Sequence, residues 1–99
     1  MSVSIRRIQW TRRALRRLDT IGVHIAKDNL VASENVVARI VASVNALAQF
    51  PSLGRVGRIA GTRENVIAGL PYIVPYRVKP DTIEVITVLH GAQKWPENF

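Results

Sequence analysis

Five side chains between Arg63 and Lys94 could together support proton transfer at a phosphate. His90 stands at the end of the last expected strand and can give or take a proton near neutral pH. Arg63, Arg77 and Lys94 could neutralise phosphate charge, and Tyr76 could donate a hydrogen bond. If these groups meet, they predict a site for phosphodiester cleavage. The alternative is a histidine bonded to backbone, a solvated Arg77 and a tyrosine that packs in the core.

A basic helix face is the second candidate site. Arg12, Arg13, Arg16 and Arg17 form two like-charged pairs four residues apart. Each such pair is unfavourable on a helix by roughly 0.2–0.5 kcal/mol, and these lie at the positive end of the helix dipole. An acidic segment docking here would relieve the repulsion, although a solvated basic face needs no partner. His24 shares this face, and we interpret it as a surface residue.

A glycine-punctuated loop, residues 51–61, forms the third candidate. It carries Arg55 and Arg58, and its sequence reads P-S-L-G-R-V-G-R-I-A-G. Backbone freedom combined with guanidinium groups can cradle a phosphate or an acidic side chain. The loop is not a Walker motif, because the G-K-[ST] ending is absent. The glycines could equally serve only to turn the chain from helix to strand.

The charge distribution indicates an anionic partner. The chain carries a formal charge of +7, and seven of its fourteen basic residues precede residue 31, opposed there only by Asp19 and Asp28. Such an excess favours binding to nucleic acid, an acidic protein or a membrane surface. A basic surface that merely keeps the protein in solution is the alternative.

Length and composition limit the architecture and location. The 99 residues show no repeat or compositional break, so we expect one domain spanning residues 1–99. Without cysteine, neither a disulfide framework nor a thiolate metal site can form, and we expect no metal and no cofactor. No run approaches eighteen apolar residues and no signal-peptide core is present, so we expect a cytoplasmic protein without membrane association.

Two amphipathic helices position the basic face. Thr11 offers an N-cap hydroxyl, and apolar residues then recur with helical spacing, which predicts a helix from Thr11 to about Asp28. The cleanest periodicity follows over Val31–Phe50, where Pro51 stops the helix. Joined by a tight turn, the two helices predict an antiparallel hairpin whose apolar faces need a partner layer.

Four strands supply that layer. The segment Val3–Trp10 predicts a strand with a bulge, because its apolar residues change parity. Asn65–Ala68, Tyr72–Val78 and Thr82–Leu89 predict a three-stranded meander. Pro75 cannot donate a ladder hydrogen bond, so we expect a bulge or a locally unpaired stretch there. The expected class is α/β, of the α+β type: order β-α-α-β-β-β, with the helical hairpin on one face of a mainly antiparallel four-stranded sheet.

The same element order and several motifs resemble the RelE/ParE superfamily of bacterial toxins. The motifs are P-S-L-G-R-V-G-R, G-T-R-E, P-Y-I-V-P-Y-R-V and V-L-H-G-A-Q-K-W-P, and the likeness runs over nearly the whole chain. It implies the toxin half of a type II toxin–antitoxin pair. A cognate antitoxin, typically acidic and partly disordered, would hold it inactive in a hetero-oligomer. The antitoxin would bind the basic face made of Arg12, Arg13, Arg16 and Arg17.

The superfamily divides by mechanism. The resemblance implies that RelE-like members cut messenger RNA on the ribosome with basic residues that project from the second and third strands of the fold. Glu64, Val66 and Ile73 occupy those positions here, and a carboxylate with two aliphatic side chains cannot stabilise a phosphorane. An endoribonuclease would have to use His90 with nearby arginines instead.

The G-T-R-E and H-G-A-Q-K-W-P motifs look more like the ParE branch, whose characterised members poison DNA gyrase by binding. Arg55, Arg58, Lys94 and Trp95 are then the candidate target-binding residues, since an aromatic anchor beside polar groups is typical of binding hot spots. Trp95 could also simply fold back on the core. A ParE-like toxin is the preferred hypothesis; an endoribonuclease and a non-catalytic basic interaction module are the alternatives.

Overall fold

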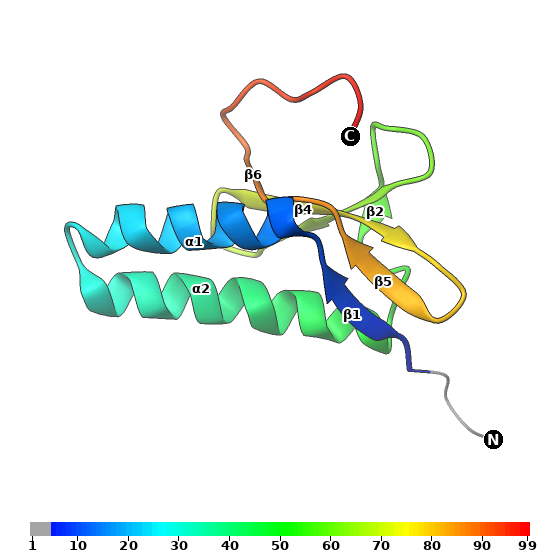
Figure 1. Ribbon diagram of the computed structural model, residues 1–99, viewed down its shortest axis with the longest axis horizontal. Coiled ribbons are helices and arrows are strands. Elements are labelled where there is room, and N and C mark those ends of the chain that lie inside the picture. The colour runs from blue at the N-terminus through cyan, green and yellow to red at the C-terminus, as the bar shows by residue number, and fades with distance from the viewer. Residues whose placement is uncertain (1–4) are drawn as a thin grey trace.

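A pair of helices and one mixed sheet make up the fold, seen in a computed structural model that describes residues 5–99. The elements are β1 (Arg7–Trp10), α1 (Arg12–Ala26), α2 (Leu30–Asn45), the 3₁₀ helix η1 (Ala46–Ala48), β2 (Arg55–Val56), β3 (Arg63–Val66), β4 (Tyr72–Val78), β5 (Thr82–Val85) and β6 (Leu89–His90). The strands follow the order β1-β5-β4-β3-β2, with β6 pairing to β4. In Figure 1 the two helices run side by side, and the C-terminal tail forms a loop after β6.

The expected fold class is confirmed, with two additions. Residues 5–99 form a six-stranded sheet rather than a four-stranded one. The extra strands, β2 and β6, have two residues each, which is too short for an alternating pattern to show in the sequence. All strand pairs in the described range are antiparallel except β1 with β5, which is parallel.

The first strand is shorter than expected. β1 begins at Arg7, while Val3 and Ser4 lie outside the described residues. Its pairing with β5 runs without interruption from Arg7 opposite Thr82 to Trp10 opposite Val85. Ile5 precedes the strand and is 68% exposed, so the change of parity needs no bulge within β1.

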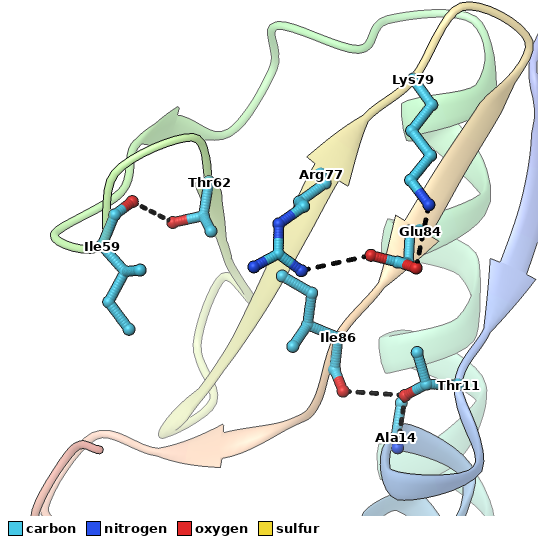
Figure 2. A network of polar contacts seen from close by, with 8 residues as sticks. All are labelled: Thr11, Ala14, Ile59, Thr62, Arg77, Lys79, Glu84 and Ile86. Carbon is cyan, nitrogen blue, oxygen red and sulfur yellow. Dashed lines mark hydrogen bonds and ion pairs between the residues drawn. The ribbon is translucent and has the colours of Figure 1, made fainter. Parts of the chain in front are cut away.

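Side-chain caps fix the helix starts. The Thr11 hydroxyl accepts a hydrogen bond from the Ala14 N–H at 3.0 Å and donates to the Ile86 carbonyl at 2.8 Å, tying α1 to the sheet (Figure 2). Asn29 caps α2 by accepting from the Ala32 N–H. The second helix tightens into η1 and ends earlier than the predicted Phe50.

The main core lies between the helical hairpin and one sheet face. Ile40 and Val44 of α2 pack with Val74 of β4 and Val85 of β5, and all four are fully buried. Helix α2 with η1 is also long and apolar enough to span a membrane, with a mean hydropathy of 1.3 over Leu30–Ala48. In this structure 22% of that window is buried, and Ile40, Val44 and Leu47 form its contact with the core.

The turn between β3 and β4 shifts the third strand. The Ile67 N–H donates to the Tyr72 carbonyl, and Gly69 adopts a φ of 74°, which only glycine takes up readily. Strand β3 therefore covers Arg63–Val66 rather than the predicted Asn65–Ala68.

Pro75 lies opposite a break in strand pairing that belongs to the neighbouring segment, residues 86–88. The register between β3 and β4 is continuous from Ile73 to Tyr76, so β4 itself has no bulge, and the prediction is wrong on that side. On the other side of β4, Tyr76 pairs with Val85 of β5 and Ile73 pairs with Leu89 of β6. Two residues of β4, Val74 and Pro75, therefore lie opposite three residues, 86–88, of the neighbouring segment. The Pro75 carbonyl accepts from the Ile86 N–H, which places the proline nitrogen at this break.

Candidate functional site

His90 lies on the sheet face covered by α1. It stands opposite Tyr72, whose ring it meets edge-on with 5.6 Å between the centroids. Its Nδ1 accepts a hydrogen bond from the Ala92 N–H at 3.0 Å, and its backbone N–H donates to Gln93 Oε1 at 2.8 Å. The first bond assigns the proton of the neutral ring to Nε2.

Tyr76 is a core residue. It is fully buried, and its hydroxyl donates to the Pro51 carbonyl at 2.7 Å while accepting from the Gly54 N–H at 2.9 Å. Burial raises the pKa of Tyr76 despite the opposing effects of the Gly54 N–H and the Arg63 charge. The expectation that Tyr76 donates a hydrogen bond to a substrate is therefore wrong, because both functions of its hydroxyl hold the turn after η1.

Arg63 and Arg77 are also engaged with neighbouring groups. Arg63 Nη1 donates to the Gly54 carbonyl at 2.7 Å. Arg77 pairs with Glu84 at 3.3 Å, and Lys79 joins the same carboxylate at 3.1 Å (Figure 2). The hydrogen bond from Lys79 is the main reason why the pKa of Glu84 is lowered; burial opposes it, and Arg77 adds to it.

The expected catalytic set does not assemble within residues 5–99. Tyr72, the partner of His90, and Tyr76, the partner of Arg63, are four residues apart on β4. His90 and Arg63 are therefore separated by roughly 13 Å along the strand. Arg77 follows Tyr76 and projects from the opposite face, because successive strand residues alternate. A hydrolytic site needs its acid, base and cations together, and here they lie at different ends and faces of the sheet.

A compact ion-pair cluster forms instead around Glu64. The Glu64 side chain is 3% exposed; Oε1 accepts from Arg55 Nε at 2.9 Å, and Oε2 accepts from the Arg58 backbone N–H at 2.9 Å. Arg58 Nε adds an ion pair at 3.4 Å. Burial on its own raises the pKa of Glu64, but the Arg58 N–H, the Arg55 hydrogen bond and both positive charges outweigh it and lower the pKa.

Trp95 completes this cluster from the C-terminal tail. The Arg58 guanidinium carbon lies 3.5 Å from the centroid of its ring, a cation–π contact. We call Arg55, Arg58 and Trp95 the arginine–tryptophan surface. Because two guanidiniums face one carboxylate, the arginine–tryptophan surface keeps a net positive charge. Both arginine side chains are about half exposed. The surface lies on the sheet face away from the helices, since the neighbouring Asn65 bonds Ser43 of α2 and Glu64 alternates with it.

Three of the four expected target-binding residues are thus brought together. Lys94 is exposed and makes no ion pair or hydrogen bond with another residue in the range 5–99. The anchor that sequence reasoning missed is Glu64, which was interpreted only as a lost catalytic position. An available signal was the carboxylate of the G-T-R-E motif, which follows two loop arginines closely enough to pair with them across a hairpin.

The arginines of α1 divide into two pairs. Arg17 Nη2 donates to Gln93 Oε1 at 3.3 Å, and Arg13 lies 5.7 Å from the Phe99 ring centroid, so both face the tail. Arg12 and Arg16 are exposed and pair with no carboxylate among the described residues. The expected four-residue basic face is therefore half free and half engaged with the C-terminal segment.

An apolar groove runs between the two helices beside this face. It has a volume of about 400 Å³, and Leu15 and Val23, 50% and 55% exposed, lie along it. The helices approach closely at Gly22, where the Ser33 hydroxyl donates to the Gly22 carbonyl at 2.6 Å. Leu15 therefore lines this groove and not the core.

The part of the chain that the structure describes contains no cluster of three or more histidine, cysteine, aspartate or glutamate side chains suited to a metal ion. The candidate sites are therefore surfaces made of arginine, aromatic and aliphatic groups. What such groups offer chemically is recognition of an anionic partner.

Comparisons with known proteins agree on one group. A family model described as "ParE toxin of type II toxin-antitoxin system, parDE" matches residues 8–95. A protein of Sinorhizobium fredii (strain NBRC 101917 / NGR234) described as "Putative toxin Y4kP" is 55% identical over 95 residues, covering 96% of this chain and 98% of that protein.

Two solved structures have similar folds. A chain of the chromosomal ParDE system from P. aeruginosa superposes with a TM-score of 0.80 and 27% identity, covering 88% of this chain and 97% of that one. A chain of the RelBE2 toxin–antitoxin complex from Mycobacterium tuberculosis gives a TM-score of 0.67 at 18% identity, over 93% of this chain and 98% of that one. The second likeness concerns the fold alone.

Proposed function

We propose, since the chain belongs to the ParE toxin family of type II toxin–antitoxin systems, that it stops growth by binding an essential target and not by cutting RNA. The observation that carries this proposal is the arginine–tryptophan surface, in which Glu64 already holds Arg55 and Arg58 in place. A binding toxin needs such a preorganised, exposed surface. A nuclease needs converging catalytic groups, and the described residues keep those apart.

The target we propose is DNA gyrase. The resemblance to the ParE branch suggests it, and a protein of net charge +7 suits an enzyme that holds DNA. Arg58, stacked on Trp95, combines a cation with an aromatic face, and both groups are enriched among residues that dominate binding energy. The toxin would act in the cytoplasm, where gyrase works.

A pair of assays tests this mechanism. Purified protein is added to gyrase with relaxed plasmid, and in parallel to translating ribosomes with a labelled message. We expect inhibited supercoiling and an intact message. Arg58→Gln and Trp95→Ala should each weaken inhibition by about tenfold or more, because hot-spot truncations cost about 2 kcal/mol.

Lys79→Gln is the matched control. It also removes one exposed cation from the sheet, but its partner is Glu84 and it lies outside the arginine–tryptophan surface. Its inhibition should equal that of the wild type. Cleaved message with unaffected gyrase would refute the proposal.

We also propose that a cognate antitoxin covers α1 and the groove beside it, forming a hetero-oligomer. Arg12 and Arg16 are exposed cations that flank the exposed Leu15, so an amphipathic acidic segment would find both charge and apolar contact there. Arg12→Gln with Arg16→Gln should weaken antitoxin binding and flatten its salt dependence, measured by calorimetry at several salt concentrations. Unchanged affinity and salt dependence would exclude this face.

A further inference from the structure

A small cavity between α1 and the end of the sheet lies apart from the arginine–tryptophan surface. It has a volume of about 160 Å³ and is lined by Arg17, Thr20, Ile21, His24, Tyr72 and His90. At about 30 Å³ for each water, it could hold roughly five waters, which is room for one small charged group. Five of the six lining side chains carry a hydrogen-bond donor, and none is a carboxylate.

Arg17 is fixed in place with donors to spare. Its Nε bonds the Val88 carbonyl at 3.1 Å, and its Nη2 bonds Gln93 Oε1 at 3.3 Å. A guanidinium has five N–H groups, so three remain. The two acceptors are a backbone carbonyl and a neutral amide, so neither supplies a counter-charge to the guanidinium.

The opposite wall is also preset. His90 Nδ1 accepts from the Ala92 N–H, so the neutral imidazole has its proton on Nε2. The edge-on contact with Tyr72 holds the ring in position. The side chains of Thr20 and His24 make no hydrogen bond to another residue in the range 5–99, so their capacity is unused. Side chains that can donate hydrogen bonds therefore line the cavity from α1, β4 and β6, with no carboxylate among them.

We propose that this cavity binds a single carboxylate, supplied by an acidic side chain of a protein segment that crosses α1. The guanidinium of Arg17 is the one permanent charge that lines it, and one charge balances a carboxylate better than it balances a doubly charged phosphate. Arg13 and Arg16 on the same helix would guide an acidic segment to the opening. Identifying that segment as part of the antitoxin rests on the proposed function; the carboxylate site does not.

Nuclear magnetic resonance of the full chain tests the site directly. The probes are a capped Ala-Ala-Glu-Ala-Ala peptide, its glutamine counterpart and inorganic phosphate, each titrated at constant ionic strength and neutral pH. We expect the glutamate peptide to shift the imidazole signals of His24 and His90 and the Arg17 Nε–H saturably. The glutamine peptide should bind at least about tenfold more weakly, the loss expected for one charge-assisted hydrogen bond.

Variants locate the effect. Arg17→Gln should abolish saturation, and Arg17→Lys, which keeps the charge but loses the fork, should weaken it about tenfold. Lys27→Gln is the matched control, because it removes one exposed positive charge at the C-cap of α1, outside the cavity, and it should change little. His24→Gln is a second cavity variant that should leave the fold intact, because it breaks no hydrogen bond within residues 5–99. It should also weaken binding of the glutamate peptide.

Three results would overturn the proposal. One is equal binding of the glutamate and glutamine peptides, and another is a Lys27→Gln effect as large as that of Arg17→Gln. The third is saturation by phosphate without saturation by the glutamate peptide, which would assign the cavity to phosphate. None of these readouts involves gyrase, message cleavage or growth, so failure here is distinguishable from failure of the proposed function.

Discussion

Replacing Glu64 by glutamine removes the negative charge between Arg55 and Arg58 while keeping the size of the side chain. The wild-type carboxylate is 3% exposed and bonds Arg55 Nε and the Arg58 N–H at 2.9 Å each. Removing one partner of a buried ion pair costs about 3–5 kcal/mol. Both guanidiniums are about half exposed and can recover hydration, so we expect about 2 kcal/mol instead.

Thermal unfolding followed by circular dichroism measures this effect. For a chain of this size a loss of about 2 kcal/mol lowers the melting temperature by roughly 10 °C. Glu84→Gln is the matched control, because it makes the same chemical change in a partly exposed pair with Arg77 and Lys79. It should cost less than about 1 kcal/mol.

The pH dependence gives an independent check on the same residue. The pKa of Glu64 is lowered below its usual 4.5 in the folded protein. The contribution of the Glu64 charge to the free energy of unfolding is therefore fully present above pH 4.5 and is lost as the pH falls through the folded pKa. The stability difference between wild type and Glu64→Gln should shrink on acidification below about pH 4.5. A difference that is constant with pH, or no larger than that of Glu84→Gln, would refute the view that charge at Glu64 organises the arginines.

The remaining predictions concern the turn after η1 and the start of α1. Tyr76→Phe should cost about 1–3 kcal/mol in urea unfolding, because the Gly54 N–H and the Pro51 carbonyl lose their partner. Since burial raises the pKa of Tyr76 above 10.0, wild-type stability should fall as the pH rises beyond that value, and Tyr76→Phe should lack this loss. Gly54→Ala should cost about 1–3 kcal/mol, because a Cβ would lie 2.6 Å from the Tyr76 hydroxyl; an unchanged midpoint would contradict this packing. Thr11→Ala should cost about 1–2 kcal/mol through the lost cap and the lost bond to Ile86, and Thr11→Ser should restore most of it.

The main elements of the fold could be predicted from the sequence because the spacing of apolar residues over a long segment indicates its secondary structure. Helical spacing located α1 and α2, and runs of β-branched residues located β4 and β5. Pro75 correctly indicated an irregularity, but the unpaired residues lie in the facing segment 86–88, since a strand can keep its own geometry when the neighbour takes up the extra residue.

The sites were harder to predict, because side-chain position depends on pairing and not on proximity in sequence. Tyr76 and Arg77 are adjacent in the chain but project from opposite faces of β4, which the alternation of a strand could already have indicated. The role of Glu64 depended on the two-residue pairing of Arg55 and Val56 with β3. A strand of two residues such as β2 is too short to be predicted from a local sequence pattern.

The parallel pairing of β1 with β5 has a consequence for biosynthesis. Arg7 lies opposite Thr82, and the Thr11 hydroxyl bonds a carbonyl 75 positions later, so the first strand can join the sheet only after most of the chain has left the ribosome. A nascent or prematurely terminated product therefore keeps an incomplete sheet. The complete sheet, and with it the surfaces proposed above for binding, therefore arises only at the very end of translation.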